Sequence, residues 1–256
     1  MLASTAEDDL VAAALAEELC VPFIDALPTA RKHSQGKLAV IVSEGIPHLQ
    51  LVDAKAPGPV PVGFESAALR HRRRAGHNEL LGRAVGWKQG RAPKVIDSTG
   101  GYGIDAFLLA DFGCTVTLTE RNPVLGVLLD HAITRARSAG DPWLRDVAER
   151  MHLLRGDANR IESEVVSDAQ VIYLDPMFPV TRRAAPGKEM QVLQALLERD
   201  KHHTPDPDGE ALFQWARQQG VPRIVVKRPR KAPLLGAKTP SHMLEGKSVR
   251  YDVYVR

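Results

Sequence analysis

The stretch that decides the fold is VIDSTGGYGID, residues 95–105. Its first residues are apolar and β-branched and predict a buried strand, and an acid and a cluster of glycines follow at once. An apolar helix pattern begins at Ile104. A strand, a glycine turn and a helix in this order present bare backbone to a nucleotide-like ligand. Glycine can adopt positive φ and lets a ligand approach the main chain without meeting a Cβ.

A second predicted strand, residues 115–119, ends on Glu120, which lies 19 residues after Gly101. This is close to the ~20 residues expected for an acid that accepts hydrogen bonds from ribose hydroxyls. The first part of the main domain therefore indicates an adenosine-type ligand without saying which one.

The composition is ordinary for a folded domain, with 256 residues, 25% charged and 44% apolar. The two cysteines, Cys20 and Cys114, do not form a metal spacing, and His202–His203 has no third ligand nearby. No apolar run approaches the ~18 residues of a membrane span. We expect a cytoplasmic protein with no bound metal and no membrane association. The oligomeric state is left open, with a monomer favoured.

Charge is distributed unevenly along the chain. Residues 66–94 carry eight Lys or Arg against one acid, and residues 221–256 carry nine against two. Such segregation suggests a polyanionic partner, although a solvated basic surface would give the same pattern.

A second informative stretch follows the predicted strand 171–174 and reads Asp175–Pro176–Met177–Phe178–Pro179. It would place a carboxylate, a rigid backbone and an aromatic face at the carboxyl edge of the sheet, where α/β proteins bind ligands. That set suits the exocyclic amine of a nucleobase. Asp175 would accept the amine's hydrogens, Pro176 would fix the geometry and Phe178 would stack on the base. Methyl transfer to the amine then needs only positioning and electrostatics.

Further strands are expected at 151–154, 222–227 and 248–255, with a long irregular segment between the last two. Asp157, just past the third strand, could accept the exocyclic amine of an adenine or cap the next helix. Residues 1–63 predict a small α+β subdomain with a helix over 6–19 and strands at 37–42 and 48–52. The main α/β domain would span residues 64–256.

Three groups of basic residues could bind RNA phosphates. The first precedes the glycine-loop strand, the second lies in the loop after Phe178, and the third follows the strand 222–227. The candidates are Arg70, Arg72, Arg73, Arg74, Arg182, Arg183, Lys188, Lys227 and Arg228.

With both stretches in hand, the sequence resembles class I S-adenosylmethionine-dependent methyltransferases, and more closely the RsmJ family. The resemblance runs from about Phe64 to the carboxyl terminus and includes the runs 120–123, 173–179, 188–190 and 225–229. It implies a Rossmann-like sheet with helices on both faces and transfer of a methyl group to the exocyclic N2 of a guanosine in 16S rRNA. By the family's pattern this is the guanosine conventionally numbered 1516.

The resemblance also extends the cofactor site beyond the glycines and Glu120. The complete set predicted to bind S-adenosylmethionine is Asp97, Gly100, Gly101, Gly103, Ile104, Asp105, Glu120, Arg121, Asp157, Ala158 and Asp175. The substrate would be 16S rRNA or the small ribosomal subunit, and the sequence does not show at which stage of assembly.

Three other functions fit parts of the sequence. A nicotinamide-dependent dehydrogenase would explain the glycines and Glu120 but leaves the turn at Asp175 without a role. A DNA adenine-N6 methyltransferase uses a similar turn, but no additional target-recognition domain is evident. A non-catalytic RNA-binding module on the same scaffold is opposed by the intact Asp175.

Overall fold

The computed structural model describes residues 2–3, 8–24, 37–53, 56–74, 79–177, 187–197 and 209–256, with only the backbone described for residues 2–3, 72–74 and 79. The chain forms two compact units. The first contains Met1–Gly63, Asn122–Ala132 and Val180–Thr204, and the second contains Phe64–Arg121, Ile133–Pro179 and Pro205–Arg256.

The first unit contains a four-stranded sheet in the order β1-β2-β3-β4. Its hairpin between β2 and β3 turns through Glu44 and Gly45, which both have positive φ, as a two-residue turn of this kind requires. Asp8 stabilises the turn, because its carboxylate accepts hydrogen bonds from both backbone amides at 3.2 and 2.7 Å. The elements here are β1 (Leu2–Ala3), α1 (Asp9–Glu18), β2 (Lys37–Ser43), β3 (Ile46–Val52), β4 (Val60–Pro61) and α8 (Lys188–Leu197).

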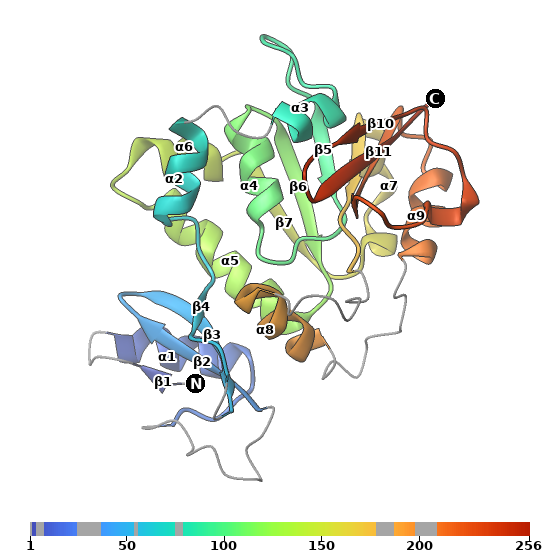
Figure 1. The fold of residues 1–256 in the computed structure, drawn as a ribbon. Helices are drawn as coiled ribbons and strands as arrows, with labels where there is room; N and C mark the ends of the chain where they lie inside the picture. The colour runs from blue at the N-terminus through green and yellow to red at the C-terminus, as the bar shows by residue number, and fades with distance from the viewer. Residues whose placement is uncertain are drawn as a thin grey trace. The chain divides into compact units, whose positions relative to one another are not determined.

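The second unit is built on a seven-stranded sheet in the order β10-β11-β9-β8-β5-β6-β7 (Figure 1). Neighbouring strands from β9 to β7 are parallel, whereas β11 runs antiparallel to both of its neighbours. The strands are β5 (Lys94–Asp97), β6 (Thr115–Glu120), β7 (Met151–Arg155), β8 (Val171–Leu174), β9 (Arg223–Pro229), β10 (His242–Glu245) and β11 (Val249–Val255).

Helices cover both faces of this sheet. On one face α4 packs against β6 and β7, and α3 packs against β9 and β11. On the other face Ile172 and Leu174 join a buried cluster with Phe213 of α9 and Val166 of α7. The helices are α2 (Ala67–Arg74), α3 (Glu79–Val85), α4 (Ile104–Asp111), α5 (Pro123–Arg137, which continues from the first unit), α6 (Pro142–Ala148), α7 (Ser163–Asp168) and α9 (Glu210–Gln218). Short 3₁₀ turns lie at Ala158–Arg160 and Leu235–Ala237.

The predicted α/β fold with helices on both faces is confirmed, and the six strands expected in the main domain are present. The main domain has one further strand, because β10 lies within the segment expected to be irregular, and the short strands β1 and β4 of the first unit were not predicted either. The side chains of β10 are mostly exposed and lack an apolar alternation, so the sequence pattern carried no signal for it. Backbone pairing with β11 forms the strand.

Candidate active site

The glycine loop between β5 and α4 is bound to the end of β6 through bare backbone. The Gly100 amide donates to the Thr119 carbonyl at 2.8 Å, and a Cβ on Gly100 would lie only 2.8 Å from the same oxygen. Gly101 and Gly103 have φ of 53° and 73°, which favours glycine at both positions. The loop can therefore take this path only without side chains at these positions.

Glu120 at the end of β6 fixes the same loop. Its carboxylate oxygen Oε2 accepts a hydrogen bond from the Gly101 amide at 2.7 Å, and the residue is buried. The sequence predicted Glu120 as the acid that binds a ribose. The structure brings it to the glycine loop, where its carboxylate holds the loop in place, and binding of a ribose stays a prediction.

Asp97 and Thr99 connect the glycine loop to the turn at Asp175. The Asp97 carboxylate accepts hydrogen bonds from the amide and the hydroxyl of Thr99, at 3.0 and 3.1 Å. The Thr99 hydroxyl in turn accepts from the Asp175 amide at 2.8 Å. Burial raises the pKa of Asp97 to about 7, against the lowering effect of the Thr99 amide.

The turn after β8 is positioned by a close approach from α9. Gly209, with φ of 68°, precedes α9, and a Cβ built on it would collide with the ring of Pro176. The absence of a side chain at Gly209 thus makes room for Pro176 beside Asp175. Phe178, predicted to stack on the base, lies outside the described residues.

Lys227 of β9 joins two carboxylates at this edge of the sheet. Its ammonium nitrogen Nζ lies 2.7 Å from Oδ2 of Asp105 and 2.7 Å from Oδ2 of Asp175. The Tyr173 hydroxyl also donates to Asp105 Oδ2, at 2.6 Å. The side chains of Lys227, Asp105 and Asp175 are 22%, 17% and 39% exposed, so Asp175 is the most accessible of the three.

The charges in this group shift one another's pKa values. Burial raises the pKa of Asp175, the Lys227 ammonium opposes this shift, and the nearby Asp105 adds to it. Burial alone would lower the pKa of Lys227, but the Asp175 and Asp105 carboxylates raise it above its ordinary value. Burial and the same two carboxylates raise the pKa of Tyr173. Tyr173 therefore acts as a neutral donor and Lys227 as a cation.

The remaining residues predicted to bind the cofactor lie near the same edge. Ile104 and Asp105 form the first turn of α4, and Arg121 follows β6. Asp157 caps the short 3₁₀ turn that contains Ala158, accepting from the Asn159 amide at 3.2 Å. The capping role considered for Asp157 is present, and contact with an adenine stays a prediction.

Among the residues predicted to bind RNA, the side chains of Arg70, Lys188, Lys227 and Arg228 are described. Arg70 pairs with Asp141, and its guanidinium carbon lies 5.4 Å from the ring centroid of Trp143. Lys188 is exposed at the start of α8. Arg72, Arg73 and Arg74 belong to α2, but their side chains, like all of Arg182 and Arg183, lie outside the described residues.

Lys227 and Arg228 were both predicted to bind phosphates, and the structure places them differently. Lys227 contacts the two carboxylates described above. Arg228 points to the opposite face of the sheet, is 1% exposed, and donates to the Pro233 carbonyl at 3.0 Å. Because its guanidinium group is inaccessible in this structure, we leave Arg228 out of the proposed RNA-binding set.

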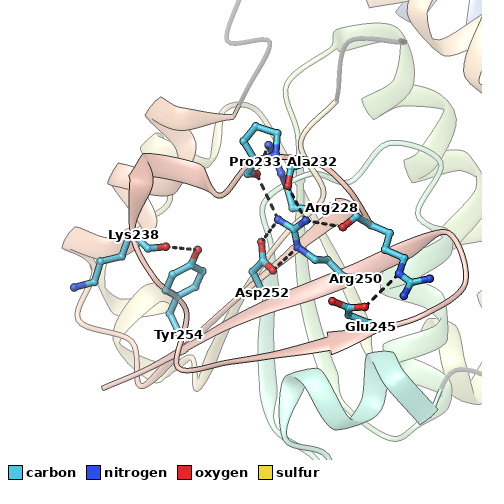
Figure 2. Close-up of polar contacts among 9 residues, drawn as sticks. Arg228, Ala232, Pro233, Lys238, Glu245, Arg250, Asp252 and Tyr254 are labelled. Atoms are coloured by element: carbon cyan, nitrogen blue, oxygen red, sulfur yellow. Dashed lines mark hydrogen bonds and ion pairs between the residues drawn. The ribbon is translucent and has the colours of Figure 1, made fainter. Parts of the chain in front are cut away.

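A second charged cluster consists of Arg250 and Asp252, and Arg228 contacts the same turn as Arg250 (Figure 2). Arg250 of β11 makes two hydrogen bonds to Asp252, at 2.7 and 3.0 Å, and both side chains are buried. Arg250 also donates to the carbonyls of Arg230, Ala232 and Pro233. Two arginines from neighbouring strands thereby hold the turn that follows β9.

Thr99, Tyr173 and Gly209 had no predicted role at the site, and Lys227 was given a different one. The sequence could have indicated one of these contacts. Side chains alternate along a strand, so Lys227 and Arg228 must face opposite sides of β9 and cannot both lie on one phosphate-binding surface. The contact between Gly209 and Pro176 had no local signal, since it depends on how α9 packs.

The described residues contain no group of three or more His, Cys, Asp or Glu side chains arranged to hold a metal ion. Within the same residues, every helix is too short or too polar to span a membrane.

The architecture of the second unit defines a class I S-adenosylmethionine-dependent methyltransferase. In its sheet, β11 runs antiparallel to its neighbours β10 and β9, a glycine loop follows β5, and acids lie at the carboxyl edge. A family model described as "Putative SAM-dependent methyltransferase" matches residues 26–256. The crystal structure of an S-adenosylmethionine-dependent methyltransferase from Neisseria gonorrhoeae has a TM-score of 0.70 and 29% identity, covering 99% of this chain and 94% of that one.

Curated relatives narrow the class further. A protein from Stutzerimonas stutzeri is 42% identical over 225 residues, covering 86% of this chain and 84% of its own length. One from Dechloromonas aromatica is 42% identical over 228 residues, covering 86% and 89%. Both are named ribosomal RNA small subunit methyltransferase J. The chain belongs to this family of S-adenosylmethionine-dependent methyltransferases.

Proposed function

We propose that this methyltransferase transfers the methyl group of S-adenosylmethionine to the exocyclic N2 of a guanosine in small-subunit ribosomal RNA. The observation that carries the proposal is the turn at Asp175, where an accessible carboxylate lies next to the glycine loop. The names of the relatives support the ribosomal substrate. The choice of guanosine N2, at the position numbered 1516, rests on the family resemblance of the sequence motifs.

The residues at the carboxyl edge of the sheet fit S-adenosylmethionine. The loop from Ser98 to Gly103 carries no Cβ at Gly100, Gly101 and Gly103, and Gly101 is partly exposed. Bare backbone of this kind suits a ligand that lies against the main chain. Glu120 and Asp157 follow adjacent strands and offer carboxylates for hydroxyl and amine groups, and Asp105 offers a third. These residues would hold the cofactor, which supplies a methyl group on a positively charged sulfur that becomes a neutral thioether on transfer.

Asp175 would act on the amine of the base. The nitrogen lone pair of such an amine is delocalised into the ring, so the amine is a poor nucleophile. By accepting one of its hydrogens, the Asp175 carboxylate favours a pyramidal nitrogen and orients its lone pair. Once the nitrogen has formed its bond to the methyl carbon it carries an extra proton, which leaves to Asp175 or to water.

RNA would be bound through phosphates by the remaining basic residues, among them Arg72, Arg73, Arg74, Arg182, Arg183 and Lys188. Release of counterions from the RNA makes such binding fall steeply with salt. The proposal also includes a cytoplasmic location, where ribosomes are assembled, and a division of the chain at residues 63 and 64. The packing of β1 to β4 into a sheet of their own supports that division, whereas residues 122–132 and 180–204 belong to the same compact unit as residues 1–63.

The test is methyl transfer from radiolabelled S-adenosylmethionine to small ribosomal subunits that lack the modification, followed by nucleoside analysis. We expect the label in N2-methylguanosine. Label in another base would leave the amine chemistry and overturn the guanosine assignment. Absence of label despite measured cofactor binding would overturn the proposal and favour a non-catalytic RNA-binding role.

A further inference from the structure

We propose that Lys227 is a positioning residue that orients Asp175 and keeps it ionised, so that one carboxylate oxygen is held and the other can accept the substrate amine. This inference rests on the proposed function, because it assigns Asp175 the role of acceptor. It replaces the phosphate-binding role that the sequence suggested for Lys227.

The first observation is geometric. The Lys227 ammonium lies 2.7 Å from Asp175 Oδ2, and the Asp175 amide donates to Thr99 Oγ1 at 2.8 Å. Backbone and side chain of Asp175 are therefore both fixed. Within the part of the chain that the structure describes, no hydrogen bond is made to Asp175 Oδ1, and the side chain is 39% exposed. The geometry thus leaves Oδ1 for the amine.

The second observation is the balance of charge around Asp175. The titratable groups facing it are Asp97 at the end of β5, Asp105 of α4, Tyr173 of β8 and Lys227 of β9, with Tyr251 of β11 beside Tyr173. Lys227 is the cation that contacts both Asp105 and Asp175. Two carboxylates sharing one site without a cation cannot both ionise readily, because each raises the pKa of the other.

The charge state decides whether Asp175 can act. An ionised carboxylate only accepts hydrogen bonds, whereas a protonated one carries a donor. A protonated Asp175 would present its own hydrogen to the amine or lose its contact with Lys227. The pairing with Lys227 stabilises the form that accepts, and at the same time it uses Oδ2, so the amine has a single oxygen to approach.

The test compares Lys227→Met with Lys227→Arg, at saturating S-adenosylmethionine and with unmodified small subunits as substrate. At neutral pH we expect Lys227→Met to lower kcat about 100-fold. The acidic limb of its pH profile should move up by about one pH unit or more, because Asp175 then ionises only at higher pH. Lys227→Arg keeps the positive charge and should keep the limb near its original position. Lys94→Met is the matched control, since Lys94 pairs with Asp168 at the surface and its loss should leave the limb unchanged.

A second measurement does not depend on turnover. Carbon-13 NMR of the Asp175 carboxyl, assigned with Asp175→Asn, follows its titration in the cofactor-free protein. We expect the native carboxyl to be ionised at neutral pH and its midpoint to rise in Lys227→Met. The inference is overturned if the native carboxyl is still protonated above neutral pH, or if Lys227→Met loses activity with its acidic limb in place. Absence of N2-methylguanosine with the native enzyme would instead contradict the proposed function, whatever the titration shows.

Discussion

Two charged clusters lie on opposite faces of the same sheet and differ in how completely their polar atoms are used. In the cluster of Asp105, Asp175 and Lys227, one cation faces two carboxylates, and Asp175 Oδ1 accepts no hydrogen bond from the residues that the structure describes. In the cluster of Arg250 and Asp252, the guanidinium group is paired with the carboxylate and with backbone carbonyls, and both side chains are buried. The first arrangement is typical of a binding or catalytic site, whereas the second is typical of an ion pair that stabilises the fold.

The difference shows how to interpret a buried ion pair. In the Arg250–Asp252 pair the charged groups are hydrogen-bonded to each other and to backbone carbonyls, so no group is left to bind a ligand. This pair stabilises the turn after β9. The hydrogen bonds that Arg250 donates to the Asp252 carboxylate also raise the pKa of Arg250, so the pair stays charged. In the Lys227–Asp175 pair at the accessible edge of the sheet, only one oxygen of the carboxylate contacts the lysine, so the other oxygen stays available.

The largest effect is expected from Asp175→Ala, which removes the acceptor of the first cluster. We expect kcat to fall about 1,000-fold, because both the orientation of the amine and its electrostatic stabilisation are lost. The affinity for S-adenosylmethionine should change less than about tenfold, measured by isothermal titration calorimetry. Asp168→Ala removes a surface carboxylate and serves as the control. Turnover close to native in Asp175→Ala would exclude the amine-acceptor role.

Arg250→Met should instead act on stability. It leaves Asp252 as an uncompensated buried charge, so we expect the free energy of unfolding in urea to fall by about 3–5 kcal/mol. Arg230→Met is the matched control, because Arg230 pairs with Glu245 at the surface and its loss should cost about 1 kcal/mol or less. Equal losses in the two variants would show that burial of the pair does not matter.

A smaller effect is expected from Gly209→Ala, which changes the turn of the first cluster without altering its charges. The added Cβ would meet Pro176, and positive φ disfavours alanine. We expect about 1–2 kcal/mol lower stability, together with a fall of about tenfold in kcat as Asp175 moves.

The control for this change is Gly90→Ala. Gly90 also has positive φ, at 79°, but its Cβ would enter open space. It should therefore share the conformational cost of Gly209→Ala and leave kcat unchanged. A matching loss of kcat in both variants would show that Pro176 does not transmit the change to Asp175.

The sequence predicted much of the fold and the location of the candidate site, because both depend on local patterns. Apolar runs at Val95 and Val171 marked strands, glycines at Gly100 to Gly103 marked the loop, and parallel topology brought Glu120 and Asp175 to one edge. The family motifs then supplied the cofactor and the reaction class.

What could not be predicted depends on contacts between distant residues. Lys227 and Asp105 are 122 residues apart, and nothing near either residue indicates the partner of the other. The basic run at Lys227 and Arg228 suggested a phosphate-binding surface because composition does not distinguish an exposed arginine from a buried one. The position of β9 between β8 and β11 in the folded sheet determines which of the two basic side chains is buried.

The alternation of Lys227 and Arg228 also has a consequence for folding. Lys227 is paired in register with Tyr251, and Arg228 with Arg250. A slip of β9 by one residue would move Lys227 to the face of Arg250 and bring Arg228 toward Asp105 and Asp175. Each misplaced side chain would meet a site shaped for the other, so the two clusters together oppose misaligned pairing of the strand. Because both side chains are cations, it is their difference in size and hydrogen-bonding geometry, rather than in charge, that would disfavour the shifted alignment of β9.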